Sequence, residues 1–142
     1  MSRLPPVPPA SSPAVRNTMQ ANKGKNTGPE LKLRKLLRKA GYPGYRIHWK
    51  AEGSRVDIAY PGRKVAIFVN GCFWHRCPRC NPSFPKSHRD YWVAKFEANR
   101  ERDARKLSEL EASGWTVVTA WECEIRDAPH DAIRRIVEIL EV

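Results

Sequence analysis

Lys64-Val-Ala-Ile-Phe-Val69 is the most informative segment for the fold class, because it is almost wholly apolar and rich in residues that favour strands. Two further β-rich runs precede it, Tyr45-Arg-Ile-His-Trp49 and Arg55-Val-Asp-Ile-Ala-Tyr60, and glycine-containing turns separate the three. Trp115-Thr-Val-Val-Thr-Ala-Trp121 predicts a fourth strand. A strand without polar positions is buried on both faces, so we expect residues 64–69 in the centre of the sheet.

Three helices are predicted around these strands. Thr27-Gly-Pro-Glu30 is typical of a capping box at the start of the first helix, and Gly41 is typical of its end. The second should begin near Ser87 and end at Ser113-Gly114, and apolar spacing predicts the third over residues 132–140. The order αβββαβα, an α/β mixed sheet flanked by helices, is similar to the core of the restriction-endonuclease-like fold, although unrelated proteins can share it.

One narrow stripe of the second helix combines large apolar side chains with two polar ones. It contains Trp92, Phe96, Asn99, Asp103, Leu107 and Leu110. This pattern predicts that Asp103 lies on the buried face. A buried, unpaired carboxylate is strongly destabilising, so Asp103 should contact a cation, a histidine or several hydrogen-bond donors. The alternative is that its side chain reaches the edge of the helix.

The chain is strongly basic, with 26 Lys and Arg against 15 Asp and Glu and a net charge of +11. Such a surplus suits a polyanionic partner, and it does not distinguish DNA from RNA. The alternative is that these charges only solvate the surface. An anionic membrane is a weaker match.

A length of 142 residues fits a single domain. Residues 1–15 are rich in proline and serine, which predicts a disordered tail before one domain over residues 16–142. Residues 16–26 are polar and basic, which is typical of an arm that binds a phosphate backbone or of a plain linker. No segment is apolar enough for a membrane span or secretory signal, so we expect a cytoplasmic protein.

Cys72-Phe-Trp-His-Arg-Cys77-Pro-Arg-Cys80 brings three thiols together, and Cys123 follows the fourth predicted strand. In a reducing compartment such spacing indicates metal binding or catalysis rather than disulfides. Four thiolates complete a tetrahedral shell, so we expect a structural Zn²⁺ site. Two alternatives remain: a redox pair formed by Cys77 and Cys80, or His75 as a ligand in place of one cysteine.

Phe68-Val-Asn-Gly-Cys-Phe-Trp-His75 resembles the signature of the very-short-patch repair (Vsr) endonuclease family, which nicks DNA beside T:G mismatches. Four further segments recur in the family's order, and the resemblance covers about residues 16–126. These segments are Arg55-Val-Asp57, Tyr91-Trp92, Asn99-Arg-Glu-Arg-Asp103 and Gly114-Trp-Thr-Val-Val-Thr-Ala-Trp-Glu-Cys123. The resemblance implies Mg²⁺-dependent hydrolysis of one phosphodiester 5′ to the mismatched thymine, as in the repair of deaminated 5-methylcytosine.

The resemblance also implies a magnesium site at Asp57 and at the backbone carbonyl of Val69. Simple strand alternation predicts that Asp57 lies opposite Val56, Ile58 and Tyr60 and faces a polar site. Mg²⁺ binds through one or two carboxylates together with substrate phosphate, so Asp57 suits this role. The alternative for Asp57 is an ordinary surface salt bridge.

The implied general base is His75, whose tautomer Asp103 would fix. Asn70 departs from the family pattern, which usually has a second histidine there. An amide can orient water or phosphate but cannot exchange a proton, so the rate or mechanism can differ. Glu30 matches an acidic residue near the family's active site, and its structural alternative is the capping box with Thr27.

Three aromatic residues, Phe73, Trp74 and Trp92, match family residues that wedge into DNA, and core packing is the alternative. Met19 matches a position that enters the opposite groove. The implied partner is double-stranded DNA with a T:G mismatch, with a functional link to a cytosine methyltransferase or mismatch-repair factors and a monomer as default. Other classes remain open: a restriction or phage-defence nuclease of the same fold, and a non-catalytic zinc-containing DNA-binding module.

Overall fold

In the computed structural model, which describes residues 27–142, four strands form one sheet in the order β1-β2-β3-β4. They are β1 (Arg46–Ala51), β2 (Ser54–Tyr60), β3 (Val65–Asn70) and β4 (Thr116–Trp121). The pairs β1–β2 and β2–β3 are antiparallel and β3–β4 is parallel, so the sheet is mixed. The four predicted strands are confirmed to within one or two residues, and the apolar β3 is an inner strand.

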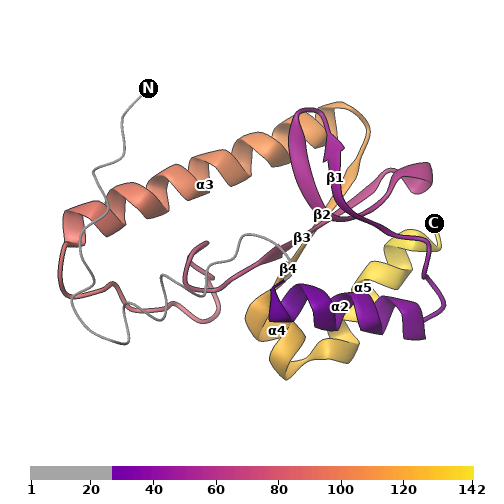
Figure 1. The fold of residues 1–142 in the computed structure, drawn as a ribbon, viewed down its shortest axis with the longest axis horizontal. Coiled ribbons are helices and arrows are strands. Elements are labelled where there is room, and N and C mark those ends of the chain that lie inside the picture. Colours follow the sequence, from indigo (N-terminus) through magenta and orange to yellow (C-terminus); the bar gives the residue numbers. More distant parts are fainter. Residues whose placement is uncertain (1–26) are drawn as a thin grey trace.

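Helices cover both faces of this sheet (Figure 1). On one side lie α2 (Gly28–Lys39), α4 (Glu122–Asp127) and α5 (Pro129–Leu140), and on the other side lies the long α3 (Arg89–Ala112). A 3-10 turn, Pro61–Arg63, joins β2 to β3. The fold class predicted from the sequence, a mixed sheet flanked by helices, is confirmed.

Alternating strand residues build two cores, because neighbouring side chains of a strand point to opposite faces. The α2 and α5 side contains the buried residues Leu33, Leu37, Ile58, Ile67, Ile136 and Leu140. On the α3 side, Leu110 packs with Ala59 and Ala66. The small alanines let the C-terminal end of α3 approach the sheet.

Part of the predicted organisation lies outside the described residues, namely the tail over 1–15 and the arm over 16–26 with Met19. Within residues 27–142, no helix is both long and apolar enough to cross a membrane.

One detail of the predicted helices is wrong. The order is αβββαβαα rather than αβββαβα, because the short α4 precedes α5 and places Cys123 in its first turn. Six residues are too few to produce a helical periodicity in the sequence. The predicted start of the long helix near Ser87 is confirmed, since α3 begins at Arg89; its N-cap residue, His88, has φ 55° and no side-chain capping bond.

Two burial predictions are also corrected. Asp103 and Leu107 are not buried: the Asp103 side chain is 34% exposed and Leu107 is 40% exposed. The stripe is buried at Trp92, Phe96 and Asn99 and again at Leu110, whereas Asp103 and Leu107 between them are not. Val56 was predicted to share a strand face with Ile58, but it packs with Ala59 on the α3 side of the sheet. The alternation of side chains changes near His48, which has φ 48° and at which the β1–β2 pairing is interrupted.

The α2 side of the core offers a direct test of the fold. Leu33→Ala should lower the free energy of unfolding by about 2–5 kcal/mol, because it leaves a cavity in a closely packed core. Leu31→Ala, on the same helix, is the matched control, since Leu31 is 50% exposed and Leu33 is 0% exposed. Urea denaturation measures both, and equal losses would contradict the packing described here.

Candidate active site and metal centre

Asp57 lies where two paired strands separate. The β2–β3 ladder ends at the pair Ile58 and Ile67, and beyond it the Asp57 carboxylate accepts a hydrogen bond from the Val69 backbone N–H at 2.8 Å. The side chain thus replaces the next rung of the ladder and fixes its own orientation. The divergence of β2 and β3 opens the space in front of this carboxylate.

Asp57 is held in an environment that disfavours its charge. Burial raises the pKa of Asp57 to about 6; the Val69 N–H opposes this shift and the charge of Glu30 adds to it. The positive charges of Arg55 and Lys106 lower the pKa by smaller amounts. A buried carboxylate next to a second one is stabilised in its ionised form by a bound cation. The donor set therefore fits a hard divalent ion at Asp57.

The candidate catalytic residues come together in one cleft of about 590 Å³. Its lining includes Glu30 from α2, Asp57 from β2, Val69 and Asn70 from β3, His75 from the following loop and Asp103 from α3. These residues are scattered over 74 positions of sequence, from 30 to 103, and the tertiary fold brings all six to one surface. The cleft also contains Arg55, Lys106 and Glu122, which the sequence did not single out.

His75 and Asp103 form a direct pair, with 2.5 Å between His75 Nδ1 and Asp103 Oδ2. Since a carboxylate accepts a proton from Nδ1–H, the pairing leaves Nε2 as the nitrogen available for a proton. A partner for Asp103 was expected because its carboxylate was expected to be buried. The partner is present, although Asp103 faces the cleft rather than the core.

Glu30 is buried and has contacts beyond the helix cap. The Thr27 hydroxyl accepts a hydrogen bond from the Glu30 backbone N–H at 3.4 Å, as in a capping box. The Glu30 carboxylate lies 3.1 Å from Arg34 and 3.7 Å from His48. Arg34 and His48 therefore hold this carboxylate at the edge of the cleft. Arg34 is four residues after Glu30 on α2, a spacing that could have identified the pair, whereas the contact with His48 depends on how α2 packs against β1.

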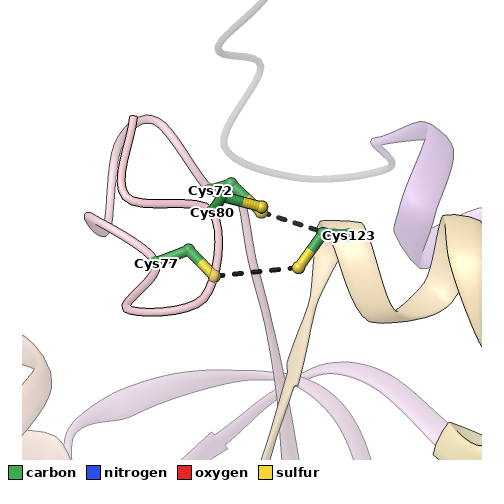
Figure 2. A group of neighbouring side chains, drawn as sticks. All are labelled: Cys72, Cys77, Cys80 and Cys123. Carbon is green, nitrogen blue, oxygen red and sulfur yellow. Dashed lines mark hydrogen bonds between the residues drawn. The ribbon is translucent and has the colours of Figure 1, made fainter. Parts of the chain in front are cut away.

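The four cysteines converge on one point (Figure 2). Their sulfur atoms lie within 4.8 Å of one another, and the Cys77–Cys123 and Cys72–Cys80 sulfur distances are both 3.7 Å. A zinc ion with four thiolates at about 2.3 Å holds sulfurs about 3.8 Å apart. The cluster therefore fits tetrahedral zinc. All four are free thiols, and their common convergence favours a metal site over a Cys77–Cys80 redox pair.

Backbone donors organise this cluster and connect it to the cleft. The Cys123 N–H donates to Cys72 Sγ at 3.3 Å, which stabilises a thiolate. The Cys72 N–H donates to the Glu122 carboxylate at 3.2 Å, and Glu122 lines the cleft. His75 lies between two cluster residues in sequence but pairs with Asp103, so the cluster is complete without it.

The three candidate wedge residues differ in position. Trp92 is 2% exposed and packs inside an aromatic cluster with Phe96 and Phe73. Phe73 and Trp74 are partly exposed and line the cleft. The Trp74 carbonyl accepts a hydrogen bond from the buried Asn99 side chain at 3.1 Å, which ties the loop to α3. Core packing therefore describes Trp92 in this structure, and the other two rings remain at the surface.

A mixed sheet with helices on both faces, carrying an acidic cleft beside a histidine–carboxylate pair, defines a nuclease domain. A solved structure supports this class: the catalytic domain of the homing endonuclease I-Bth0305I aligns with a TM-score of 0.56 and 29% identity. The alignment covers 80% of this chain and 94% of that domain.

The chain belongs to the Vsr endonuclease family. The family model described as DNA mismatch endonuclease Vsr matches residues 11–81. Type II nicking enzyme V.XorIIP of Xanthomonas oryzae pv. oryzae is 46% identical over 79% of this chain and 82% of its own length. DNA mismatch endonuclease Vsr of Escherichia coli is 31% identical, over 87% of this chain and 78% of its own length. Type II nicking enzyme V.NaeI of Lentzea aerocolonigenes is 39% identical over 86% of this chain and 74% of its own length.

Proposed function

We propose that this protein is a Mg²⁺-dependent DNA endonuclease that nicks one strand 5′ to the thymine of a T:G mismatch. The observation that carries the proposal is the single cleft in which Asp57 lies together with the 2.5 Å His75–Asp103 pair. The net charge of +11 suits the DNA substrate, and the mismatch follows the named activity of the E. coli relative. Repair of deaminated 5-methylcytosine, with a cytosine methyltransferase as functional partner, belongs to the same proposal.

Asp57 and the Val69 carbonyl would hold the magnesium ion at the point where β2 and β3 separate. A bound Mg²⁺ would neutralise charge on the phosphate oxygens during hydrolysis. The chain's own contribution is orientation: the Val69 N–H fixes the Asp57 carboxylate, and Glu30, held by Arg34, adds negative potential that favours a cation.

His75 would accept the proton of the attacking water at Nε2, and Asp103 would stabilise the resulting imidazolium. Asn70, at the end of β3, would orient water or phosphate through its amide. The exposed parts of Phe73 and Trp74, together with the arm over residues 16–26 and Met19, would grip the mismatched step. A structural zinc ion in the cysteine cluster would keep the His75 loop in place.

The test is a strand-resolved nicking assay with Mg²⁺ on duplexes that differ only by a T:G or a C:G pair. The expected result is one nick that depends on T:G and is lost in His75→Ala. His130→Ala is the control, because His130 is an exposed histidine on α5. Failure to nick in any flanking context would overturn the proposal and favour a zinc-containing DNA-binding module.

A second candidate is a restriction-associated or phage-defence nuclease. V.XorIIP and V.NaeI are described as Type II nicking enzymes, and Asn70 departs from the mismatch-repair pattern. Cutting of the fully paired C:G duplex at the same rate would favour this function.

Asp103→Asn should reduce the nicking rate by about 10²-fold or more while the protein stays folded. The amide can still contact His75 but cannot stabilise a positively charged imidazole. Glu101→Gln, an exposed acid on the same helix, should retain wild-type activity. Single-turnover rates measure both, and an Asp103→Asn rate near wild type would remove His75–Asp103 as the catalytic pair.

A further inference from the structure

A second hollow, which we call the α3 groove, lies beside the catalytic cleft and has a volume of about 370 Å³. Its walls are Phe68 of β3, Val117 and Trp121 of β4, and Leu107 of α3. The groove lies between two packed parts of α3, because Trp92, Phe96 and Asn99 contact the zinc loop and Leu110 contacts the sheet. The middle of the helix therefore spans the sheet without closing on it.

The α3 groove leaves apolar surface open to solvent next to charged groups. Leu107 is 40% exposed, and Phe68, Val117 and Trp121 are each only partly buried. Arg100 and Lys106 also line the groove, and the Lys106 ammonium lies 6.0 Å from the centre of the Phe68 ring. Phe68 and Val117 pack on one side against the core that contains Leu110, and Trp121 packs against the cysteine cluster, so only part of each side chain faces the groove. Apolar surface that stays open in a hollow suits a ligand with flat, apolar faces.

The polar groups of the groove are of three kinds. Asn70 and Thr119 provide an amide and a hydroxyl, Arg100 and Lys106 provide positive charge, and the paired His75 and Asp103 lie on the side shared with the cleft. A nucleotide has the matching features, since its base has apolar faces and a polar edge and its phosphate is negative. Charge complementarity therefore favours a nucleotide over an uncharged apolar ligand.

The α3 groove is continuous with the catalytic cleft. Phe68, Asn70, His75, Asp103 and Lys106 line both. A nucleotide in the groove would therefore lie next to the phosphate at which His75 activates water. This continuity identifies the ligand as part of the same DNA strand rather than as a free nucleotide.

We propose that the α3 groove binds one unstacked base of the DNA strand, next to the phosphate that is cleaved. Trp121 and Phe68 contact the faces of the base, and Asn70 and Thr119 contact its edge. A mismatched step is easier to unstack than a paired one, so the groove contributes to selection of the substrate. The inference rests on the proposed function in requiring DNA as the substrate, and it adds a subsite for a base.

The test fills the groove from α3 without substituting a core residue or a catalytic residue. Ala104 is an exposed residue of α3 that lines the groove, so Ala104→Trp fills it. Ala112→Trp is the matched control, because Ala112 is an exposed alanine at the end of the same helix and lines neither the groove nor the cleft. Dissociation constants are measured without Mg²⁺ for T:G duplexes that carry one abasic residue at successive positions around the mismatch.

At one position, the wild type should bind the intact duplex about tenfold more tightly than the abasic duplex. Ala104→Trp should bind the two equally, and Ala112→Trp should behave as the wild type. If no position shows a preference that Ala104→Trp removes, the base subsite is wrong.

The nicking assay separates this result from the proposed function. If the wild type nicks T:G duplexes but shows no position-specific preference for the intact over the abasic duplex, only the base subsite is wrong. If it shows this preference but does not nick, only the proposed function is wrong.

Discussion

Asp57→Asn should abolish nicking, with a rate loss of at least about 10³-fold, and leave DNA affinity within about twofold. The loss follows because a magnesium ion contributes several kcal/mol of charge stabilisation to phosphodiester hydrolysis, and an amide binds it far more weakly. The amide oxygen can still accept the Val69 N–H, so the local structure is retained. Single-turnover kinetics and filter binding measure the two quantities.

The same variant should be more stable than the wild type in Mg²⁺-free buffer at pH 7, by up to about 3 kcal/mol. Burial raises the pKa of Asp57 to about 6, so ionisation of the folded protein is penalised relative to the unfolded chain. In the wild type, the stability contributed by the protonated Asp57 carboxyl is fully present below pH 3.8, the pKa of the unfolded chain. It is lost as the pH rises through about 6, the pKa of the folded protein. The difference between variant and wild type should therefore disappear towards pH 4.

Asp131→Asn is the control for both measurements, since Asp131 is an exposed acid on α5. It should change neither nicking nor the pH profile of stability. Full activity of the Asp57→Asn variant would show that Asp57 is not needed for catalysis.

Cys80→Ser should release zinc and lower the free energy of unfolding by about 3 kcal/mol or more, because metal binding contributes directly to folding. Cys80 is the cluster residue best suited to this test. It is exposed, whereas Cys72, Cys77 and Cys123 are buried, so serine removes a ligand without leaving a cavity. Metal content by mass spectrometry and thermal melting measure the effect.

Activity should fall together with zinc content. Cys72 and Cys77 lie on either side of His75 in the sequence, so a loop without zinc no longer holds His75 against Asp103. Arg79→Ser, at the exposed residue before Cys80, should retain zinc, melting temperature and nicking. Wild-type protein that contains no zinc, or that melts identically with a chelator, would refute the structural metal.

Much of the fold could be predicted because its signals are local. Strand formation depends on short runs of β-branched and aromatic residues, and all four runs appear as strands. The spacing of Cys72, Cys77 and Cys80 is likewise local, and the cluster forms as that spacing predicts. Asp57, His75 and Asp103 could be singled out from the resemblance, with helical periodicity as independent support for Asp103.

Other features required the packed chain. The contacts of Glu30 with His48, and of Glu122 with Cys72, join segments whose proximity no local pattern encodes. The exposure of Asp103 and Leu107 was not predictable from the helical wheel, because a wheel shows which residues share a face but not which part of that face meets another element.

Local sequence patterns predicted the four strands and the helices α2, α3 and α5, and they identified the residue types available for metal, proton and DNA chemistry. Packing of the whole chain was needed to separate β2 and β3 at Asp57, to leave a groove between α3 and the sheet, and to bring His75 to Asp103. The physical reason is that secondary structure follows from interactions between near neighbours in the chain, whereas a cleft is the space that remains after distant elements have packed against one another.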